Sequence, residues 1–275
     1  MNIRFYNARI LSMAEGEPVR TGEVWVEGKR ITAVGSPAPG QKTPVWNQEI
    51  DCRGGLLMPG FKDAHTHSAM TFLRSFADDL PLQDWLTRQV FPREAKLTPE
   101  DIYELSRLAI LEYLTSGITA NFDMYMSPDS IAAASIDCGF RTVLVGAMNN
   151  FSQSPEQLDE WYRRWNNADP LVSFMLGFHA EYTTSRERME AVAALAEKYK
   201  APVFMHNSET AAEVEGCRER YGLTPTGLFE QLGLYRYGGG GYHCVWLEDQ
   251  DYEIMRRRGL SVVTNPASNA KLASG

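Results

Sequence analysis

The sequence predicts an α/β protein: a (β/α)8-type barrel preceded by a small N-terminal β-sandwich part. From residue 55 onward, apolar runs of strand length alternate with longer helical patterns, which is typical of parallel βα units. Before that point the chain holds only short apolar runs separated by Gly and Pro. All five histidines follow strand-length apolar runs, at the end of the strands where such barrels carry their active sites.

Residues 1–54 are expected to form a small antiparallel sheet that is part of a composite β-sandwich. Short apolar stretches at 24–26 and 31–34 alternate with turn residues, and Gly28-Lys29 between them is a tight-turn signal. A few short strands bury little surface, so this sheet is expected to need partner strands. No glycine-rich phosphate-binding loop follows any predicted strand, so a nucleotide-phosphate site is unsupported.

Residues 55–275 are expected to form the barrel domain. Pro99 and Pro155 follow Thr98 and Ser154 as helix-start signals should. An additional helix at 82–90 falls in the long connection after the first strand, which is long enough to cover a barrel mouth. The predicted strands are 56–63, 118–123, 141–148, 171–178, 202–206, 239–243 and 260–264. The other predicted helices are 98–116, 129–138, 155–166, 185–199, 209–221 and 248–258.

The strand count falls one short of a closed barrel. Seven strands are predicted, whereas a closed βα barrel has eight strands over ~250 residues. We therefore expect a barrel that is incomplete at its C-terminus. Strands one and seven would then present unpaired edges, so the chain alone is expected to be weakly soluble and nearly inactive.

Composition excludes several classes of protein. The 275 residues carry a net charge of −8 and have a pI near 5.2, which argues against a nucleic-acid surface. No apolar run reaches the ~18 residues of a membrane span, and the N-terminus has no signal core. The four scattered cysteines are typical of reduced thiols. We expect a cytoplasmic protein with a small-molecule substrate. The sequence does not determine its oligomeric state, and a homo-oligomer is one of the alternatives.

The histidines predict a metal site. His65 and His67 end the first barrel strand and, two residues apart, point to the same side. His179, His206 and His243 end the fourth, fifth and sixth strands. A lone histidine at a strand end is usually a surface or capped residue, but five at one end favour metal binding. Neutral imidazole nitrogens suit Zn, Fe, Ni or Cu.

Glu209 is the candidate acid–base group. It lies three residues past His206, where a carboxylate can reach a metal-bound water and shuttle its proton. The alternative is that Glu209 only complements the positive end of the following helix. His243 either binds a second metal or holds the attacking hydroxide. The fourth strand ends in His179 and offers no lysine to bridge two metals, so one metal ion is expected.

Four segments resemble motifs of the amidohydrolase superfamily. Residues 59–67, Pro-Gly-Phe-Lys-Asp-Ala-His-Thr-His, are similar to its first-strand HxH motif, and residues 206–210 to its strand-five HxxE. Residues 243–247 and 265–272 are similar to the motifs after strands six and seven. Together, over the whole chain, they resemble the branch of chlorohydrolases, cytosine deaminases and adenosylhomocysteine/methylthioadenosine deaminases.

This resemblance implies a metal-dependent hydrolase barrel that acts on C–N bonds other than peptide bonds. The implied reaction is hydrolytic deamination of an aminated N-heterocycle or nucleoside, with release of ammonia. His65, His67 and His206 would bind one divalent transition metal, zinc or alternatively iron. Glu209 would protonate the ring nitrogen and then the leaving amine, while His243 would orient the hydroxide. The family's last ligand, an Asp ending strand eight, has no counterpart in this sequence.

The resemblance also implies substrate contacts. His179 would face the substrate, and Trp85 and Glu94 match positions that cover it and hold ribose hydroxyls. Trp85 could equally be a packed helix residue, and Glu94 a solvated one. Adenosylhomocysteine deaminases place an Arg in strand three for the amino-acid carboxylate. The nearest match here is Gly146, which disfavours a charged tail and leaves a neutral nucleoside or a free base.

Two other functions stay open at the level of sequence. The first is a related hydrolase that displaces a halide or an alkylamine from a triazine-like ring. The second is a non-catalytic role, with the barrel fragment used as a scaffold.

Overall fold

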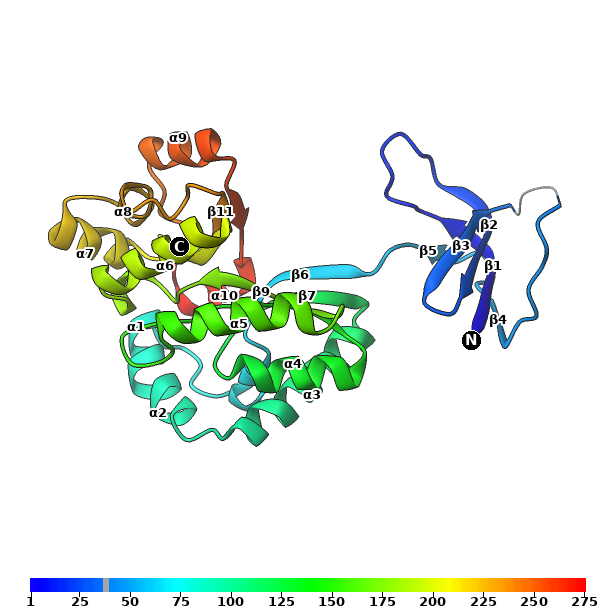
Figure 1. Ribbon diagram of the computed structural model, residues 1–275, viewed down its shortest axis with the longest axis horizontal. Helices are drawn as coiled ribbons and strands as arrows, with labels where there is room; N and C mark the ends of the chain where they lie inside the picture. The colour runs from blue at the N-terminus through cyan, green and yellow to red at the C-terminus, as the bar shows by residue number, and fades with distance from the viewer. Residues whose placement is uncertain (37–39) are drawn as a thin grey trace. The chain divides into compact units, whose positions relative to one another are not determined.

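The computed structural model describes residues 1–36 and 40–275 and divides into two compact units, Met1–Phe61 and Lys62–Gly275 (Figure 1). The division predicted after residue 54 falls inside the first unit, because the Leu56–Leu57 strand pairs with the first strand of the chain. A small hydrophobic cluster in this unit centres on Ala8, Ile10 and Val24.

The first unit is one five-stranded mixed sheet, so the prediction of an antiparallel sheet is wrong. Its strands run in the order β3-β2-β1-β4, and β5 also pairs with β1. β1 is antiparallel to β2, and β2 to β3, whereas β4 and β5 run parallel to β1. The sequence signals were turn residues, which indicate only hairpins between strands that are neighbours in sequence. The parallel partners of β1, which are β4 and β5, come from further along the chain. The strands are β1 (Asn2–Ile10), β2 (Arg20–Glu27), β3 (Arg30–Gly35), β4 (Gln48–Asp51) and β5 (Leu56–Leu57).

The second unit is built on a seven-stranded sheet whose strands follow one another in sequence order, from β6 to β12. Strands β7 to β12 pair in parallel, as expected for βα units that each return the chain to the same end. The strands are β6 (Phe61–Thr66), β7 (Ile118–Met124), β8 (Arg141–Val145), β9 (Val172–Gly177), β10 (Val203–Asn207), β11 (Gly239–His243) and β12 (Ser261–Val263).

The first barrel strand differs from its prediction. The run predicted as one strand at 56–63 is divided: Leu56–Leu57 belongs to the first unit, and the barrel strand begins only at Phe61. Pro59-Gly60 lies between the two, and Pro lacks the amide hydrogen that a ladder needs. As a result, His65 lies within β6 and His67 follows it directly. The other six predicted strands overlap strands of the structure.

Helices alternate with these strands, and α3 to α6 pack against β7 to β9 (Figure 1). Helix α3 begins with a capping box in which Thr98 and Asp101 exchange side-chain to main-chain hydrogen bonds. In the described residues no helix is long and apolar enough to cross a membrane. The main helices are α3 (Pro99–Thr115), α4 (Pro128–Cys138), α5 (Pro155–Ala168), α6 (Arg186–Tyr199), α7 (Ala211–Tyr221), α8 (Pro225–Gln231), α9 (Asp249–Arg258) and α10 (Pro266–Leu272).

The helix predicted at 82–90 is two short consecutive pieces, and the helical path continues beyond it into a third. α1 (Leu82–Asp84) passes into a π-helical stretch, η2 (Trp85–Val90), and then into α2 (Phe91–Glu94). A 3-10 helix, η1 (Ser68–Leu73), precedes them, and another, η3 (Glu181–Thr183), follows β9. Helices α8 and α10 were not predicted from the sequence, and both are only seven residues long.

Close packing of three neighbouring strands positions the site. A Cβ atom at Gly177 would lie 2.6 Å from the Phe204 carbonyl oxygen and 2.7 Å from that of Gly146. Only glycine permits this approach, which brings the ends of β8, β9 and β10 together. Beyond that point, the His206 amide donates to the His179 carbonyl at 2.9 Å. Two of the predicted site histidines are thereby fixed side by side.

Candidate metal centre and substrate cavity

Four histidines converge at the carboxyl ends of the barrel strands. The ligand atoms of His65, His206 and His243 all lie within 4.8 Å of one another. The Nε2 atoms of His65 and His206 are 3.1 Å apart. The His67 ring lies beside them, with its centroid 4.6 Å from that of His65 and 5.4 Å from that of His206. The strands β6, β10 and β11 therefore bring residues that are far apart in sequence to one point.

Three of these rings are anchored through Nδ1. In each ring Nδ1 lies within hydrogen-bond distance of an oxygen that can only accept, so Nδ1 donates and Nε2 keeps its lone pair. Histidine ligands of metals are commonly fixed in this way, with the second nitrogen on a carbonyl or side-chain oxygen. The pairs are His67 with the Met124 carbonyl at 2.6 Å, His206 with the His179 carbonyl at 2.7 Å, and His243 with the Asn269 side-chain oxygen at 2.6 Å.

His65 has a different environment. Its Nδ1 is buried and has no hydrogen-bond partner among the described residues, and its ring stacks on Tyr242 at 3.7 Å between centroids. Burial, followed by repulsion between neighbouring imidazoles, lowers the pKa of His65 and of His206 well below the ordinary value. Neutral rings are the form that binds transition metals. The close approach of the His65 and His206 Nε2 atoms on two buried neutral rings fits such an ion.

Glu209 lies in the turn between β10 and α7, beside His243. Its side chain is buried, and its Oε1 is 3.4 Å from His243 Nδ1. The Ser274 hydroxyl donates to the same oxygen at 3.2 Å. Burial, and to a smaller extent the neighbouring carboxylate of Glu213, raise the pKa of Glu209 to about 8.

A cavity of about 380 Å³ opens over the histidines. Its size lies within the range of small-molecule sites, and most of its lining residues are apolar or aromatic, with the polar ones mainly histidine and glutamate. His65 is the one predicted site residue that does not line it. The seven that do are His67, Trp85, Glu94, His179, His206, Glu209 and His243.

Part of the cavity wall comes from the connection after β6. Trp85 in η2 and Glu94 in α2 both line the cavity, and burial raises the pKa of Glu94. His179 lies on the β9 side, where its Nδ1 is 2.8 Å from the Thr183 hydroxyl. Burial lowers the pKa of His179 to about 3, so this ring is neutral. The structure thus places all three predicted substrate residues at the cavity, and their roles stay predictions.

Sequence reasoning missed three residues of the site. Asn269 in α10 holds His243, Glu213 in α7 accepts the main-chain amide of Glu209, and Tyr182 in η3 lines the cavity. Asn269 lies inside the segment 265–272, which the resemblance had singled out without a role for this residue. Glu213 and Tyr182 gave no signal, because their contribution depends on tertiary contacts.

Gly146 follows β8 and is tightly packed against the neighbouring strand. A Cβ at this position would lie 2.7 Å from the Gly177 carbonyl oxygen and 3.2 Å from the Leu158 side chain. Gly146 is also not a lining residue of the cavity, whereas Ala147 and Asn149 are. Strand packing restricts this position to glycine in this chain, and the absence of a charged tail on the substrate stays a prediction.

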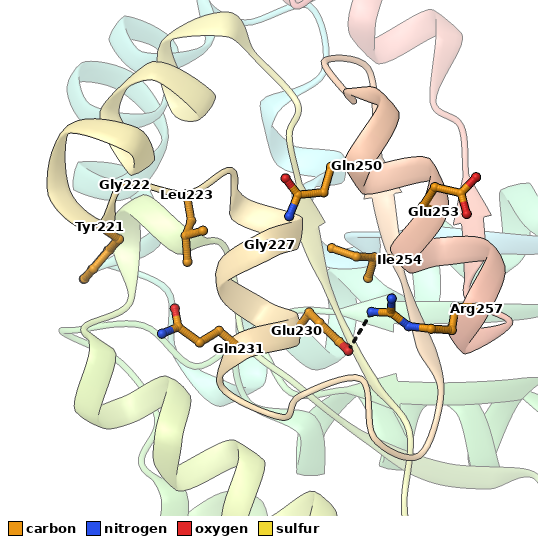
Figure 2. A pocket seen from close by; sticks show the side chains of 10 residues that line it. All are labelled: Tyr221, Gly222, Leu223, Gly227, Glu230, Gln231, Gln250, Glu253, Ile254 and Arg257. Carbon is orange, nitrogen blue, oxygen red and sulfur yellow. Dashed lines mark hydrogen bonds and ion pairs between the residues drawn. The ribbon is translucent and has the colours of Figure 1, made fainter.

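A second hollow, of about 510 Å³, lies on the outside of the barrel around α8 and α9 (Figure 2). Glu230 and Arg257 form an ion pair across it at 3.1 Å, and Leu223 and Ile254 contribute apolar surface. None of the predicted site residues lines it, and it contains no histidine or cysteine. Its residues do not form a catalytic arrangement.

Comparison with known proteins identifies the family. The profile of the amidohydrolase family matches residues 56–275, which is most of the chain. The chain belongs to the amidohydrolase family. The predicted fold class, a (β/α)8-type barrel with a separate N-terminal sheet, is thereby confirmed.

Curated relatives of this family member are deaminases. The chain is 38% identical to the 5-methylthioadenosine/S-adenosylhomocysteine deaminase of Desulforamulus reducens, and the match covers 98% of the chain and 63% of the relative. It is also 38% identical to the 5'-deoxyadenosine deaminase of Methanosarcina acetivorans, again over 98% of the chain and 63% of the relative. The chain therefore spans somewhat less than two thirds of these relatives.

Solved structures show the same fold. An adenosine deaminase from Xanthomonas campestris with bound zinc superposes with a TM-score of 0.89 at 32% identity, over 99% of this chain and 64% of that one. The guanine deaminase of C. acetobutylicum gives a TM-score of 0.86 at 20% identity, over 100% and 70% of the two chains. At that identity the likeness shows the fold alone.

Proposed function

We propose that the protein binds one divalent transition metal, zinc, and hydrolytically deaminates an adenine-type nucleoside with release of ammonia. The observation that carries this proposal is the placement of Glu209 beside His243 at the edge of a histidine cluster that opens into one cavity. The names of the relatives with 38% identity support the reaction and the nucleoside class.

His65, His67 and His206 would hold the metal. The bonds from His67 and His206 to main-chain carbonyls fix these two rings, and His65 supplies a buried ring between them. Three histidines are an established ligand set for catalytic zinc. When bound, the metal would activate a water molecule for attack on the ring carbon that carries the amino group.

Glu209 would move the protons. Water adds to the ring carbon and the C–N bond to the amino group breaks, so one proton must reach the ring nitrogen and another the departing amine. A buried carboxyl at the cavity wall can donate its proton to the ring nitrogen, receive one proton of the water and pass it to the amine, and regain its own proton from the added hydroxyl as the carbonyl forms. The products are then the oxo-heterocycle and ammonia.

His243 would orient the attacking water. Its Nδ1–H is held by Asn269, so its Nε2 can accept a hydrogen bond from that water. Its contact with Glu209 links the two residues that handle the water's proton. This role separates His243 from the three rings that we assign to the metal.

The cavity walls fit a nucleoside. Trp85 would cover the heterocycle, the neutral ring of His179 would face it, and the carboxyl of Glu94 would accept hydrogen bonds from sugar hydroxyls. Planar rings stack well on aromatic side chains.

An ammonia-release screen of the purified protein tests the proposal. The panel contains adenosine, 5'-deoxyadenosine, 5-methylthioadenosine, S-adenosylhomocysteine, guanine, cytosine and a chlorotriazine. We expect release from at least one adenine nucleoside. Chloride release from the triazine, with no ammonia from any nucleoside, would replace deamination by the alternative hydrolysis. Because the seven-stranded chain alone is expected to be nearly inactive, the screen is also run on a form extended through an eighth strand. A metal-loaded extended form that converts none of these compounds would contradict the proposal.

A further inference from the structure

Glu213 is a buried carboxylate that the proposed reaction does not use. It lies in the first turn of α7, where its side chain is 2% exposed. A glutamate at this position commonly reaches back to the amide of the N-cap residue. Here the Glu213 side chain reaches past the N-cap residue Thr210 to the two residues that precede it. One oxygen accepts the Glu209 amide at 2.7 Å, and the other accepts the Ser208 amide at 3.2 Å.

These two amides form the turn that carries the Glu209 side chain into the cavity. Ser208 has a φ of 51°, a left-handed conformation that a residue with a side chain rarely adopts. On its other side the turn is attached to the segment after β11, because the Ser208 carbonyl accepts the amides of Val245 and Trp246 at 3.0 and 2.8 Å. Glu213 therefore closes the remaining side of a turn whose backbone is held in a disfavoured conformation.

The helix itself does not need this carboxylate. The start of α7 is capped by Thr210, whose hydroxyl accepts the Glu213 main-chain amide at 3.1 Å. Burying a carboxylate is costly unless its oxygens are hydrogen-bonded, and here both oxygens are used on the turn. Its position serves the Ser208–Glu209 peptide and not the helix.

We propose that Glu213 is a positioning residue, which fixes the main chain of Ser208 and Glu209 through its two carboxylate oxygens and thereby places the Glu209 carboxyl beside His243. This inference rests on the proposed function in one respect, namely that Glu209 transfers protons in the reaction. The hold on the turn can be tested without activity.

The test compares Glu213→Gln and Glu213→Asp with Glu215→Gln, an exposed carboxylate on the same helix. Glutamine has the same shape but turns an amide donor toward one of the two N–H groups, and aspartate is too short to reach both. In Glu213→Gln we expect the Ser208 and Glu209 amides to exchange hydrogen at least about tenfold faster than in the wild type. We expect kcat for ammonia release to fall at least about tenfold, with KM within a factor of about three and metal content unchanged. Glu215→Gln should match the wild type in every readout.

Unchanged amide protection in both Glu213 variants, or faster exchange with unchanged kcat, would overturn the proposal. If neither variant folds, Glu213 is a structural residue of the barrel, which also contradicts a positioning role. If a wild type extended through an eighth strand releases no ammonia, the proposed function fails, whereas the exchange measurement still decides whether Glu213 holds the turn.

Discussion

Replacing Glu209 by Gln tests the chemistry of the site. The substitution keeps the size of the side chain and an oxygen that can accept from the Ser274 hydroxyl, so fold and metal content are expected to persist. It removes the group that exchanges protons with water, ring nitrogen and leaving amine. A positioned acid–base group contributes about 10²–10⁴-fold to a rate, and Glu209 would serve two transfers, so we expect a loss near the upper end. A 10⁴-fold loss corresponds to about 5.4 kcal/mol in the activation free energy.

The assay measures kcat for ammonia release on the best nucleoside of the screen, together with elemental metal content and a thermal melt. Glu215→Gln provides a matched control on the neighbouring helix, because its carboxylate is exposed and outside the cavity. A Glu209→Gln protein that keeps its metal and a tenth of the wild-type kcat would refute the reasoning. Glu209 would then only complement the start of α7.

Three further substitutions probe the supporting structure. Asn269→Ala removes the hydrogen-bond acceptor for His243 Nδ1. We expect kcat to fall about 10–100-fold with KM nearly constant. A wild-type kcat would show that Asn269 does not orient His243. Leu158→Ala leaves a cavity at a fully buried core position. We expect the free energy of unfolding, measured with urea, to fall by about 2–5 kcal/mol. A fall of under about 1 kcal/mol would show that the core collapses into the cavity. Gly177→Ala forces a Cβ against two carbonyl oxygens and is expected to cost about 1–3 kcal/mol or more. Gly216→Ala, in α7, is the control, because its Cβ would meet the end of the Arg220 side chain and no carbonyl oxygen, and it is expected to cost clearly less than Gly177→Ala. Equal stability of the two variants would contradict the packing argument.

The alternation of apolar runs was enough to predict the barrel, because every βα unit repeats one local pattern. The same alternation could not predict which strands pair when the two strands are far apart in the sequence. Leu56–Leu57 belongs to the first sheet because β1 accepts it as a partner, and no local signal separates this pair from Phe61 except Pro59-Gly60. The parallel pairing of β4 with β1 was missed for the same reason.

The site was predictable to the extent that strand ends determine it. His65 and His206 are 141 positions apart, yet both occupy carboxyl ends of strands in one parallel sheet, so their approach follows from topology. Asn269 and Glu213 could not be predicted in the same way. Their contacts depend on where a helix begins relative to a neighbouring strand end, and this is set by packing and not by periodicity.

Metal content measured by elemental analysis tests the central claim most directly, since it does not depend on knowing the substrate. The wild-type protein and the variants His65→Ala and His206→Ala are purified without added metal and then loaded under identical conditions. The account predicts close to one transition-metal ion per chain in the wild type, and loss of most of it in each variant. Full metal content in both variants would contradict the assignment of these histidines as ligands.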